Sequence, residues 1–437
     1  MIKPSINVMW FRRDLRLFDN VALYEALRSG LPVIPLFIFD KNILDDLEDK
    51  ADRRVAFIHA ALLNMQAELM KLGSSLEVYY STPVETFQLL QKKYAVSKVF
   101  INRDYEQYAI QRDATIEHKL QQEGVSFYTY KDQVIFEKKE ITKEDGLPYT
   151  IFTPYSNKWK AAVTDEILKN YVTETYFSAF YKQTEQNIPS LEIMGFIPME
   201  PSFPPRELNA DIIEKYTEQR NFPSINGTSR MGVHLRFGTV SIRQLVRQAQ
   251  KLNQTFLNEL IWREFYQMIL WNFPRISEGR AFKKEYDLIE WRNDKTEFQK
   301  WCEGKTGYPI VDAGMRELNA TGYMHNRVRM IVASFLSKHL LIDWRWGEQY
   351  FAKKLLDYDF ASNNGGWQWA AGSGCDAAPY FRVFNPTLQT EKFDKDLKYV
   401  RKWVPELDSF DYPAPMVVHE VARKRALDTY AKALKRN

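Results

Sequence analysis

Short apolar runs alternate with stretches of helical spacing over roughly the first 130 residues of the chain. Apolar runs of this length are typical of parallel strands that are covered on both faces. The runs occupy residues 6–11, 32–39, 76–80, 98–102 and 125–130, and the helical stretches occupy residues 20–29, 52–72, a segment after Pro83, and 105–123. This alternation predicts an α/β N-terminal domain, residues 1–133, built on an open parallel Rossmann-like sheet of five strands.

The periodicity fails between residues 134 and 205, where prolines become frequent: Pro148, Pro154, Pro189, Pro198, Pro201, Pro204 and Pro205. We expect a long interdomain connection with a few short helices, because connections of this length are unusual inside one compact domain. Residues 206–437 have helical spacing and no convincing strand, which predicts an all-α C-terminal domain. Its last segment, 423–437, has the pattern of a basic amphipathic helix, which by itself is more typical of a solvated face than of a nucleic-acid arm.

Composition and charge narrow the class of protein. At 437 residues the chain exceeds what one hydrophobic core usually supports, and with a net charge of +4 it would have to meet a polyanion through a local basic face. Cys302 and Cys375 offer no disulfide framework, and the six histidines form no metal-binding motif. The N-terminus enters a strand without a signal peptide, and no apolar run reaches the ~20 residues that span a bilayer. We therefore expect a cytoplasmic location, no metal and no membrane.

The candidate chemistry centres on Asp357 to Trp369, which reads D-Y-D-F-A-S-N-N-G-G-W-Q-W. Acids, amides, a glycine pair and two indoles stand together there, and the chain as a whole has 11 tryptophans. Buried polar groups need partners, so a planar cofactor that forms hydrogen bonds would account for the combination. A packed helical turn with an ordinary glycine break would also account for it. Both interpretations stay open from these residues alone.

Two further segments bear on phosphate binding. The first turn of the α/β domain, Phe11 to Arg16, is not GxGxxG, which argues against an ordinary dinucleotide site in that domain. Residues 227–230, G-T-S-R, precede a helical run and are suited to binding phosphate at a helix N-terminus. A hydroxyl that simply caps the helix is the more common use of such residues.

Two helical segments place charged residues beside aromatic ones. Glu259, Trp262 and Arg263 share one helix face by their spacing, which would suit recognition of a flat polar base. A surface ion pair beside a core tryptophan is the plainer interpretation. In the second segment, residues 325–330, Arg329 needs a partner if it is buried, and Asp357 and Asp359 are the candidates.

Taken in order and spacing, these strings resemble the photolyase/cryptochrome family. They are F-R-R-D-L-R-L-F-D-N near the N-terminus and then T-S-R, L-I-W-R-E-F-Y, H-N-R-V-R-M, L-I-D-W-R-W-G-E, D-Y-D-F-A-S-N-N-G-G-W-Q-W and D-A-A-P-Y-F-R-V-F-N-P. The resemblance covers nearly the whole chain. Within the family, the chain is most similar to class I cyclobutane pyrimidine dimer photolyases.

The resemblance implies FAD in the helical domain. The positions that would hold its nucleotide part, chiefly the phosphates, are Tyr216, Thr228, Ser229, Arg230, Met231 and Gly232. The positions that would surround the isoalloxazine and ribityl are Arg263, Arg329, Asp357, Asp359 and Asn363. Asn363 falls where the family contacts flavin N5. Asn there is similar to repair enzymes, whereas the signalling branches usually carry Asp or Cys.

The resemblance also implies a route for electrons and a pocket for the substrate. Trp367, Trp344 and Trp291 match a tryptophan chain that photoreduces FAD, although three core indoles would look the same in isolation. A flipped-out cyclobutane dimer would be received by Glu259, Trp262, Asn326, Met330 and Trp369. Glu259, Trp262, Met330 and Asn363 are the catalytic candidates. The six-four branch would place a second His at Asn326, so this chain favours cyclobutane dimers.

UV-damaged DNA is the implied partner. Besides the pocket residues, the positions expected to contact it are Arg220, Arg327, Arg382, Gln389 and Lys392. We expect a monomer with no obligate protein partner. The implied reaction is dimer splitting by an electron from photoexcited reduced FAD. Two alternatives are a blue-light photoreceptor of the cryptochrome type, which the absence of a long tail after the basic helix disfavours, and a flavoprotein that has lost repair activity.

A second, light-harvesting chromophore is less defined. Folate-binding members carry Asn-Glu where this chain has Tyr108-Ala109, and Cys-Lys where it has Ser277-Glu278. These departures weaken the expectation of folate. A deazaflavin, a flavin mononucleotide (FMN) or no antenna at all stay open.

Overall fold

The structure is a computed structural model that describes residues 3–199 and 202–434. Met1 and Ile2, Pro201 of the predicted connection, and the last three residues of the predicted C-terminal helix lie outside this part. The chain divides into two compact units, which are described separately. The α/β unit comprises residues 1–137, 162–208 and 230–248, and the helical unit comprises residues 138–161, 209–229 and 249–437.

The α/β unit contains the predicted five-stranded parallel sheet, with strand order β3-β2-β1-β4-β5. The strands are β1 (Ser5–Phe11), β2 (Val33–Asp40), β3 (Glu77–Ser81), β4 (Ala95–Asn102) and β5 (Ser126–Tyr130). Each agrees with a predicted run to within three residues at either end. All eight residues of β2 are buried, as expected for a strand that is covered on both faces.

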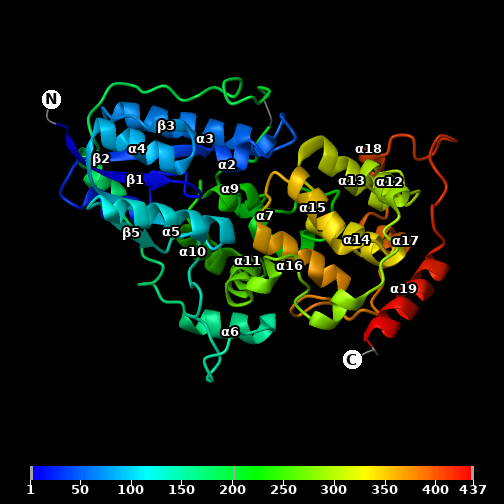
Figure 1. Cartoon of the computed structure of the whole chain (residues 1–437). Coiled ribbons are helices and arrows are strands. Elements are labelled where there is room, and N and C mark those ends of the chain that lie inside the picture. The colour runs from blue at the N-terminus through cyan, green and yellow to red at the C-terminus, as the bar shows by residue number, and fades with distance from the viewer. Residues whose placement is uncertain (1–2, 200–201, 435–437) are drawn as a thin grey trace. The chain divides into compact units, whose positions relative to one another are not determined.

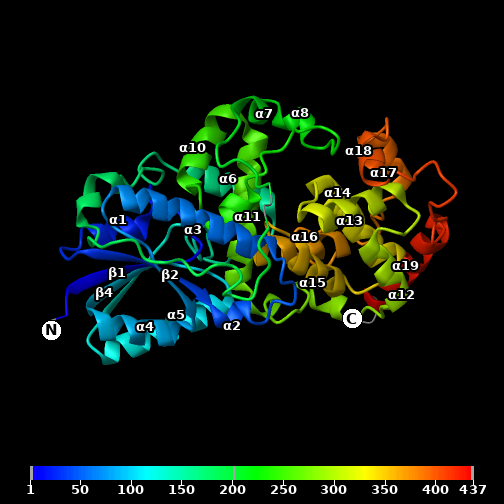
Figure 2. The same cartoon turned by 90° about the horizontal axis from the view of Figure 1, so that it is seen from above.

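Helices cover both faces of this sheet (Figures 1 and 2). Figure 2 shows α1 (Val21–Leu27) and α3 (Arg53–Lys71) on one face, and α4 (Pro83–Lys93) and α5 (Gln107–Gln122) on the other. The second face packs into a cluster that includes Trp10, Leu36 and Val99 from the strands. The remaining elements of the unit are α2 (Lys41–Leu44), η1 (Thr173–Ala179), α9 (Gly232–Phe237) and the first part of α10 (Ile242–Leu252).

Ion pairs fill the carboxyl end of the sheet, where open α/β folds usually bind ligands. Arg12, just after β1, pairs with Asp113 at 2.7 Å, and Arg13 pairs with Asp104 at 3.1 Å. A second, fully buried group joins Arg16 and Arg243 to Asp132, at 2.7 and 2.9 Å. Burial alone would raise the pKa of Asp132, but the two guanidinium groups lower it. The arginines of the F-R-R-D-L-R turn therefore form ion pairs inside this unit.

The helical unit contains no strand among its described residues, as predicted. Its elements are most of α6 (Phe152–Ala162), α7 (Ala210–Glu214), α8 (Tyr216–Gln219), α11 (Gln254–Asn272), η2 (Pro274–Ile276), η3 (Lys284–Leu288), α12 (Lys295–Glu303), α13 (Pro309–Thr321), α14 (Asn326–Ser334), η4 (Phe335–His339), α15 (Trp344–Lys354), α16 (Phe360–Ala371), α17 (Pro386–Phe393), α18 (Lys398–Trp403) and α19 (His419–Leu434). η4 is a π-helical turn. Across the described ranges, no helix is both long and apolar enough to cross a membrane.

The compact units are less contiguous than the expected ranges 1–133, 134–205 and 206–437. Residues 138–161 of the expected connection belong to the helical unit, and residues 230–248 of the expected C-terminal domain belong to the α/β unit. The predicted short helices of the connection are present as α6 and η1. The chain therefore passes between the units more often than the sequence suggested, and the functional domain boundaries stay a prediction.

Candidate functional site

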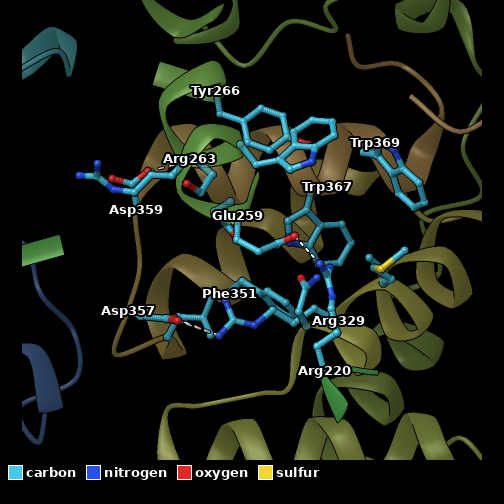
Figure 3. A pocket seen from close by; sticks show the side chains of 18 residues that line it. Arg220, Glu259, Arg263, Tyr266, Arg329, Phe351, Asp357, Asp359, Trp367 and Trp369 are labelled. Atoms are coloured by element: carbon cyan, nitrogen blue, oxygen red, sulfur yellow. Dashed lines mark hydrogen bonds and ion pairs between the residues drawn. The ribbon is translucent and has the colours of Figure 1, made fainter. Parts of the chain in front are cut away.

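A cavity of about 390 Å³ lies in the helical unit where α16 packs against α11, α14 and α15. Figure 3 shows the side chains that line it. They are Arg220, Glu259, Trp262, Arg263, Tyr266, Asn326, Arg329, Met330, Ala333, Phe351, Leu355, Asp357, Asp359, Ser362, Asn363, Gly366, Trp367 and Trp369. Most of the segment Asp357 to Trp369 therefore contributes to the lining of one cavity.

The glycine pair Gly365 and Gly366 lies inside helix α16. Its N-cap is Asp359, whose carboxylate accepts from Ser362 N, and it ends at Gly372 with a positive φ. A Cβ on Gly365 would lie 2.3 Å from the Tyr266 ring, so only glycine allows this approach. A Cβ on Gly366 would meet nothing within 4 Å, and this glycine lines the cavity. Gly365 thus allows the helix to pack against Tyr266, and Gly366 leaves the cavity open beside the helix. The helix continues through both glycines.

Asn363 presents an oriented amide to the cavity. Its Nδ2 donates to the backbone oxygen of Glu348 at 3.1 Å and to Glu348 Oε1 at 2.9 Å. Both amide hydrogens are used, and no donor in the described ranges reaches Oδ1. Burial raises the pKa of the Glu348 carboxyl, although the hydrogen bond from Asn363 opposes this. The site therefore offers an acceptor to a ring N–H group.

The predicted ion pair of Arg329 is present. Arg329 Nη2 contacts both carboxylate oxygens of Asp357, at 3.1 and 3.0 Å, and its Nε donates to Met324 O at 2.7 Å. Burial alone would lower the pKa of Arg329, but Asp357 raises it. Arg263 and Asp359 lie next to each other at another edge of the same cavity (Figure 3). Cationic and anionic side chains are thus both available to a polar ligand.

The five predicted dimer-pocket residues all line this cavity. Glu259 lies on α11 and pairs with Arg220 at 2.5 Å, instead of with its helix neighbour Arg263. Burial raises the pKa of Glu259, against the effect of Arg220. Trp262 stacks on Phe152, with ring centroids 3.8 Å apart and an interplanar angle of 6°. The plainer interpretation of α11, a surface ion pair beside a core tryptophan, therefore does not describe these residues.

Three of the predicted DNA-contacting arginines influence one another. Arg220 lines the cavity, and Arg327 donates to Asn221 Oδ1 at 2.6 Å. Burial lowers the pKa of Arg327, and the positive charges of Arg220 and Arg382 lower it further. These three arginines form what we call the basic rim. Lys392 and Gln389 lie on α17, where Lys392 Nζ stands over the Phe393 ring at 5.4 Å, and Arg327 stands over the same ring at 4.4 Å.

The three predicted relay tryptophans share one hydrophobic cluster. Trp367 and Trp344 are each 2% exposed, and Trp291 packs against the cluster from its edge. Trp367 lies directly against α15, since a Cβ on Gly347 would be 2.0 Å from its ring. Trp367 also contacts Trp301, with centroids 6.0 Å apart. The relay assignment stays a prediction.

The predicted phosphate-binding residues are not brought to this cavity. Tyr216, Thr228 and Ser229 belong to the helical unit but do not line it, and residues 230–232 belong to the α/β unit. Thr228 Oγ1 lies 3.2 Å from the Tyr323 hydroxyl. The alternative use as an N-cap is wrong, because the N-cap of α9 is Met231 and no side chain caps that helix. The phosphate role stays a prediction.

Several site residues carry no clear sequence signal. Glu348 ends the string L-I-D-W-R-W-G-E, but nothing in its spacing connects it to Asn363. Phe152 precedes Trp262 by more than a hundred residues. Tyr266 ends the string L-I-W-R-E-F-Y, and the glycine at position 365 is the one sequence signal of a close approach by its ring. Within the described part of the chain, no cluster of three or more metal-ligating side chains occurs.

The cavity fits a flat, polar, aromatic cofactor such as FAD. Gly366 leaves space where a side chain would otherwise stand, and Asn363 Oδ1 is available as an acceptor. The Trp367 Nε1–H is buried without a hydrogen-bond partner among the residues that the structure describes, and charged side chains line the cavity wall. These are the features that a planar ring with polar edges requires.

Comparison with known proteins agrees with this fit. Residues 7–172 match the family model described as DNA photolyase, and residues 256–411 match that described as FAD binding domain of DNA photolyase. The chain is 37% identical to deoxyribodipyrimidine photo-lyase of Vibrio cholerae, over 98% of this chain and 100% of that protein. It is 38% identical to the Escherichia coli protein of the same name, over 99% of both.

Solved structures give the same result. A bacterial class III photolyase from Agrobacterium tumefaciens has a TM-score of 0.87 and 33% identity, covering 100% of this chain and 99% of that one. An archaeal photolyase from Sulfolobus tokodaii with two FAD molecules has a TM-score of 0.82 and 33% identity, covering 98% and 100%. A Synechocystis cryptochrome has a TM-score of 0.82 at 25% identity, also covering 98% and 100%.

Proposed function

Because this chain belongs to the DNA photolyase family, we propose that it is a light-dependent DNA repair enzyme, a deoxyribodipyrimidine photo-lyase, with FAD as its cofactor. The observation that carries the proposal is that one cavity collects two sets of side chains. Asn363, Arg329 and Asp357 suit a flavin, while Glu259 and Trp262 suit a damaged base pair. Cofactor and substrate would therefore meet in the same space.

When bound in its reduced form, FAD would supply light-driven, reversible one-electron transfer to the cyclobutane ring. No net oxidation or reduction results. The protein's task is to bind, orient and exclude water. Asn363 would offer its acceptor to the flavin ring, while Arg263, Arg329, Asp357 and Asp359 would hold the ring system and ribityl chain. Tyr216, Thr228, Ser229, Arg230, Met231 and Gly232 would hold the nucleotide part.

The substrate would be a cyclobutane pyrimidine dimer that is flipped out of DNA. Trp262 and Trp369 would pack against the fused bases, with Met330 filling the space between apolar surfaces. Glu259 and Asn326 would hydrogen-bond the polar base edges. The raised pKa of Glu259 supports this role, because a carboxyl that is protonated more easily can donate as well as accept.

DNA would be held by phosphate contacts around the cavity. The basic rim of Arg220, Arg327 and Arg382 supports this: Glu259 offsets part of the Arg220 charge, and a phosphate would reduce the repulsion that the other arginines exert on Arg327. Gln389 and Lys392 would extend the contact along α17. Affinity would then fall as salt rises.

Membership of the photolyase family also leads to proposals on the electron relay, the oligomeric state and a second chromophore. Trp367, Trp344 and Trp291 would carry electrons to oxidised FAD from the surface. The enzyme would act as a monomer without an obligate protein partner, in the cytoplasm, and as a class I enzyme. A second chromophore would be a deazaflavin, FMN or absent, with folate weakened by the departures at Tyr108-Ala109 and Ser277-Glu278.

A blue-light photoreceptor is the second candidate, and the likeness to a cryptochrome structure is the observation that favours it. The names of the relatives at 37% and 38% identity favour repair. Asn363 also favours repair, because the signalling branches that the sequence resembles usually carry Asp or Cys there.

The first experiment is an absorption spectrum of the purified protein, followed by blue light under reducing conditions with a dimer-containing oligonucleotide. Flavin bands with light-dependent loss of dimers are expected. A further near-ultraviolet or violet band would identify the antenna. Bound flavin without repair would transfer the assignment to a photoreceptor, and a protein without flavin would overturn the cofactor assignment.

A further inference from the structure

Lys338 is a buried lysine that the proposed reaction does not use. It lies in the π-helical turn η4 and is 1% exposed, and Phe335 and Leu336 of the same turn belong to the hydrophobic core. Its Nζ donates to the backbone oxygen of Arg382 at 2.8 Å, and no carboxylate of the described residues forms an ion pair with it. Burial, followed by the charge of Arg382, lowers the pKa of Lys338 to about 7.

A buried ammonium of this kind is unfavourable for the fold. Removing a charged amine from water without an anionic partner costs several kcal/mol, and apolar replacements of buried charges are often neutral or stabilising. Packing therefore does not account for a lysine at this position. π-helical turns are frequent at functional sites because they change the direction of side chains.

The segment that Lys338 holds has little regular backbone bonding, although Tyr380 stacks on Tyr430 with centroids 6.0 Å apart and Phe384 packs against the hydrophobic core. Residues 379–385 form no helix or strand, and their backbone bonds are local: Arg382 N donates to Pro379 O at 2.9 Å, and Val383 N to Phe381 O at 3.1 Å. Phe381 is 60% exposed. The bond from Lys338 connects the middle of this segment to the helical core.

Arg382 is also a member of the basic rim. Its positive charge is one of the two that lower the pKa of Arg327, so its guanidinium lies within electrostatic reach of Arg327, which follows the cavity residue Asn326 in the chain. A backbone bond at Arg382 O restricts where that guanidinium can go. The buried lysine and the exposed arginine are thus connected through a single carbonyl group.

We propose that Lys338 is a positioning residue for DNA binding, whose buried ammonium fixes the backbone at Arg382 and keeps that guanidinium in the basic rim. The inference rests on the proposed function, since it takes the basic rim to be a DNA-contacting surface. Lys338 itself touches neither cofactor nor substrate.

The test replaces Lys338 in the full-length, flavin-loaded protein and measures DNA affinity and thermal stability together. Lys338→Met keeps the length of the side chain but cannot donate, whereas Lys338→Gln keeps a donor without the charge. Lys424→Met removes one exposed positive charge from α19 and is the control for net charge. The probe is a duplex that contains one cyclobutane dimer, at several salt concentrations.

We expect Lys338→Met to raise the dissociation constant about threefold to tenfold and to reduce the salt slope by about 1, the scale of one lost phosphate contact. Its midpoint of thermal unfolding should stay the same or rise, because an unfavourable buried charge is gone. Lys338→Gln should bind more like the wild type, and Lys424→Met should bind like it. A structural role would instead lower stability and affinity in parallel, and that result would overturn the inference.

A double-mutant cycle with Arg382→Ala tests whether Lys338 affects DNA binding through Arg382. If Lys338 acts through Arg382, the double variant binds no more weakly than Arg382→Ala alone. Additive losses would overturn the inference, and so would normal binding by Lys338→Met. If Arg382→Ala binds normally while the wild type repairs dimers, the inference fails and the proposed function stands. If the wild type does not bind the dimer duplex, both fail.

Discussion

Glu348 fixes the direction of the Asn363 amide by accepting both of its hydrogens, one on the backbone oxygen and one on Oε1. The carbonyl oxygen of Asn363 is thereby directed at the cavity. An amide that could rotate would present a donor half of the time, and a donor repels a ring N–H. The acid on α15 therefore sets the polarity of the amide on α16.

The first prediction concerns this pair. Glu348→Ala should leave FAD bound but lower the repair yield per photon about fivefold, as the loss of about 1 kcal/mol of orienting hydrogen bond implies. Reduced flavin should also be reoxidised faster in air. Glu348→Gln is the control, because its side-chain oxygen can still accept from Asn363. Equal yields in Glu348→Ala and wild type would show that the amide orientation does not matter.

The second prediction concerns Glu259. Glu259→Ala should lower repair per photon about tenfold, because it removes a hydrogen-bond partner of the substrate and leaves Arg220 uncompensated in the cavity. Flavin absorbance should not change. Glu303→Ala, which removes an exposed acid from α12, serves as the control. Unaltered repair by Glu259→Ala would remove this residue from the dimer pocket.

The third prediction concerns the stacked pair Phe152 and Trp262. Phe152→Leu should weaken binding of dimer DNA about threefold to tenfold, since aromatic pairs contribute about 0.5–1.5 kcal/mol and the indole loses its support. Phe152→Tyr keeps the ring and should bind normally. Phe410→Leu, at a fully exposed position, controls for the loss of an aromatic ring. If Phe152→Leu bound as well as Phe152→Tyr, the stack would have no role in holding Trp262.

The fourth prediction concerns the tryptophans. Trp291→Phe should slow the photoreduction of oxidised FAD at least tenfold, because one step of the electron relay is lost. A tenfold change corresponds to about 1.4 kcal/mol of activation free energy. Repair by prereduced enzyme should continue. Trp403→Phe, in an indole that packs against the same cluster, should photoreduce normally. Normal photoreduction in Trp291→Phe would exclude it from the relay.

The alternation of strands and helices could be predicted because doubly covered strands leave continuous apolar runs, as in β2. The cavity residues could be predicted because their strings resemble a family in register. Glu348 and Lys338 could not, since a buried charge leaves no pattern when its partner is distant in sequence or is a carbonyl group. The division of residues 230–248 from the helical unit likewise depends on tertiary packing, which no local pattern records.

The last prediction concerns acid stability. His339 is fully buried in η4, stacks on Phe335 with centroids 4.8 Å apart, and lies 2.8 Å from His419 at the start of α19. Burial, with the positive charges of His419, Arg425 and Lys338 adding to it, lowers the pKa of His339 to about 3.

In the unfolded chain this histidine takes up a proton near its ordinary pKa of about 6.5. Between that pH and about 3 the unfolded state therefore binds more protons than the folded state, and stability is lost as pH falls through this window. At pH 5 the loss from His339 alone is about 2 kcal/mol relative to pH 7. His339→Gln, which cannot titrate but can still donate to His419, should show a smaller fall in the unfolding midpoint between pH 7 and pH 5. Hydrogen exchange along α19 should increase at pH 5 in the wild type and less in the variant. The same fall in both proteins would mean that acid acts elsewhere, and that the two histidines do not hold α19 in a pH-dependent way.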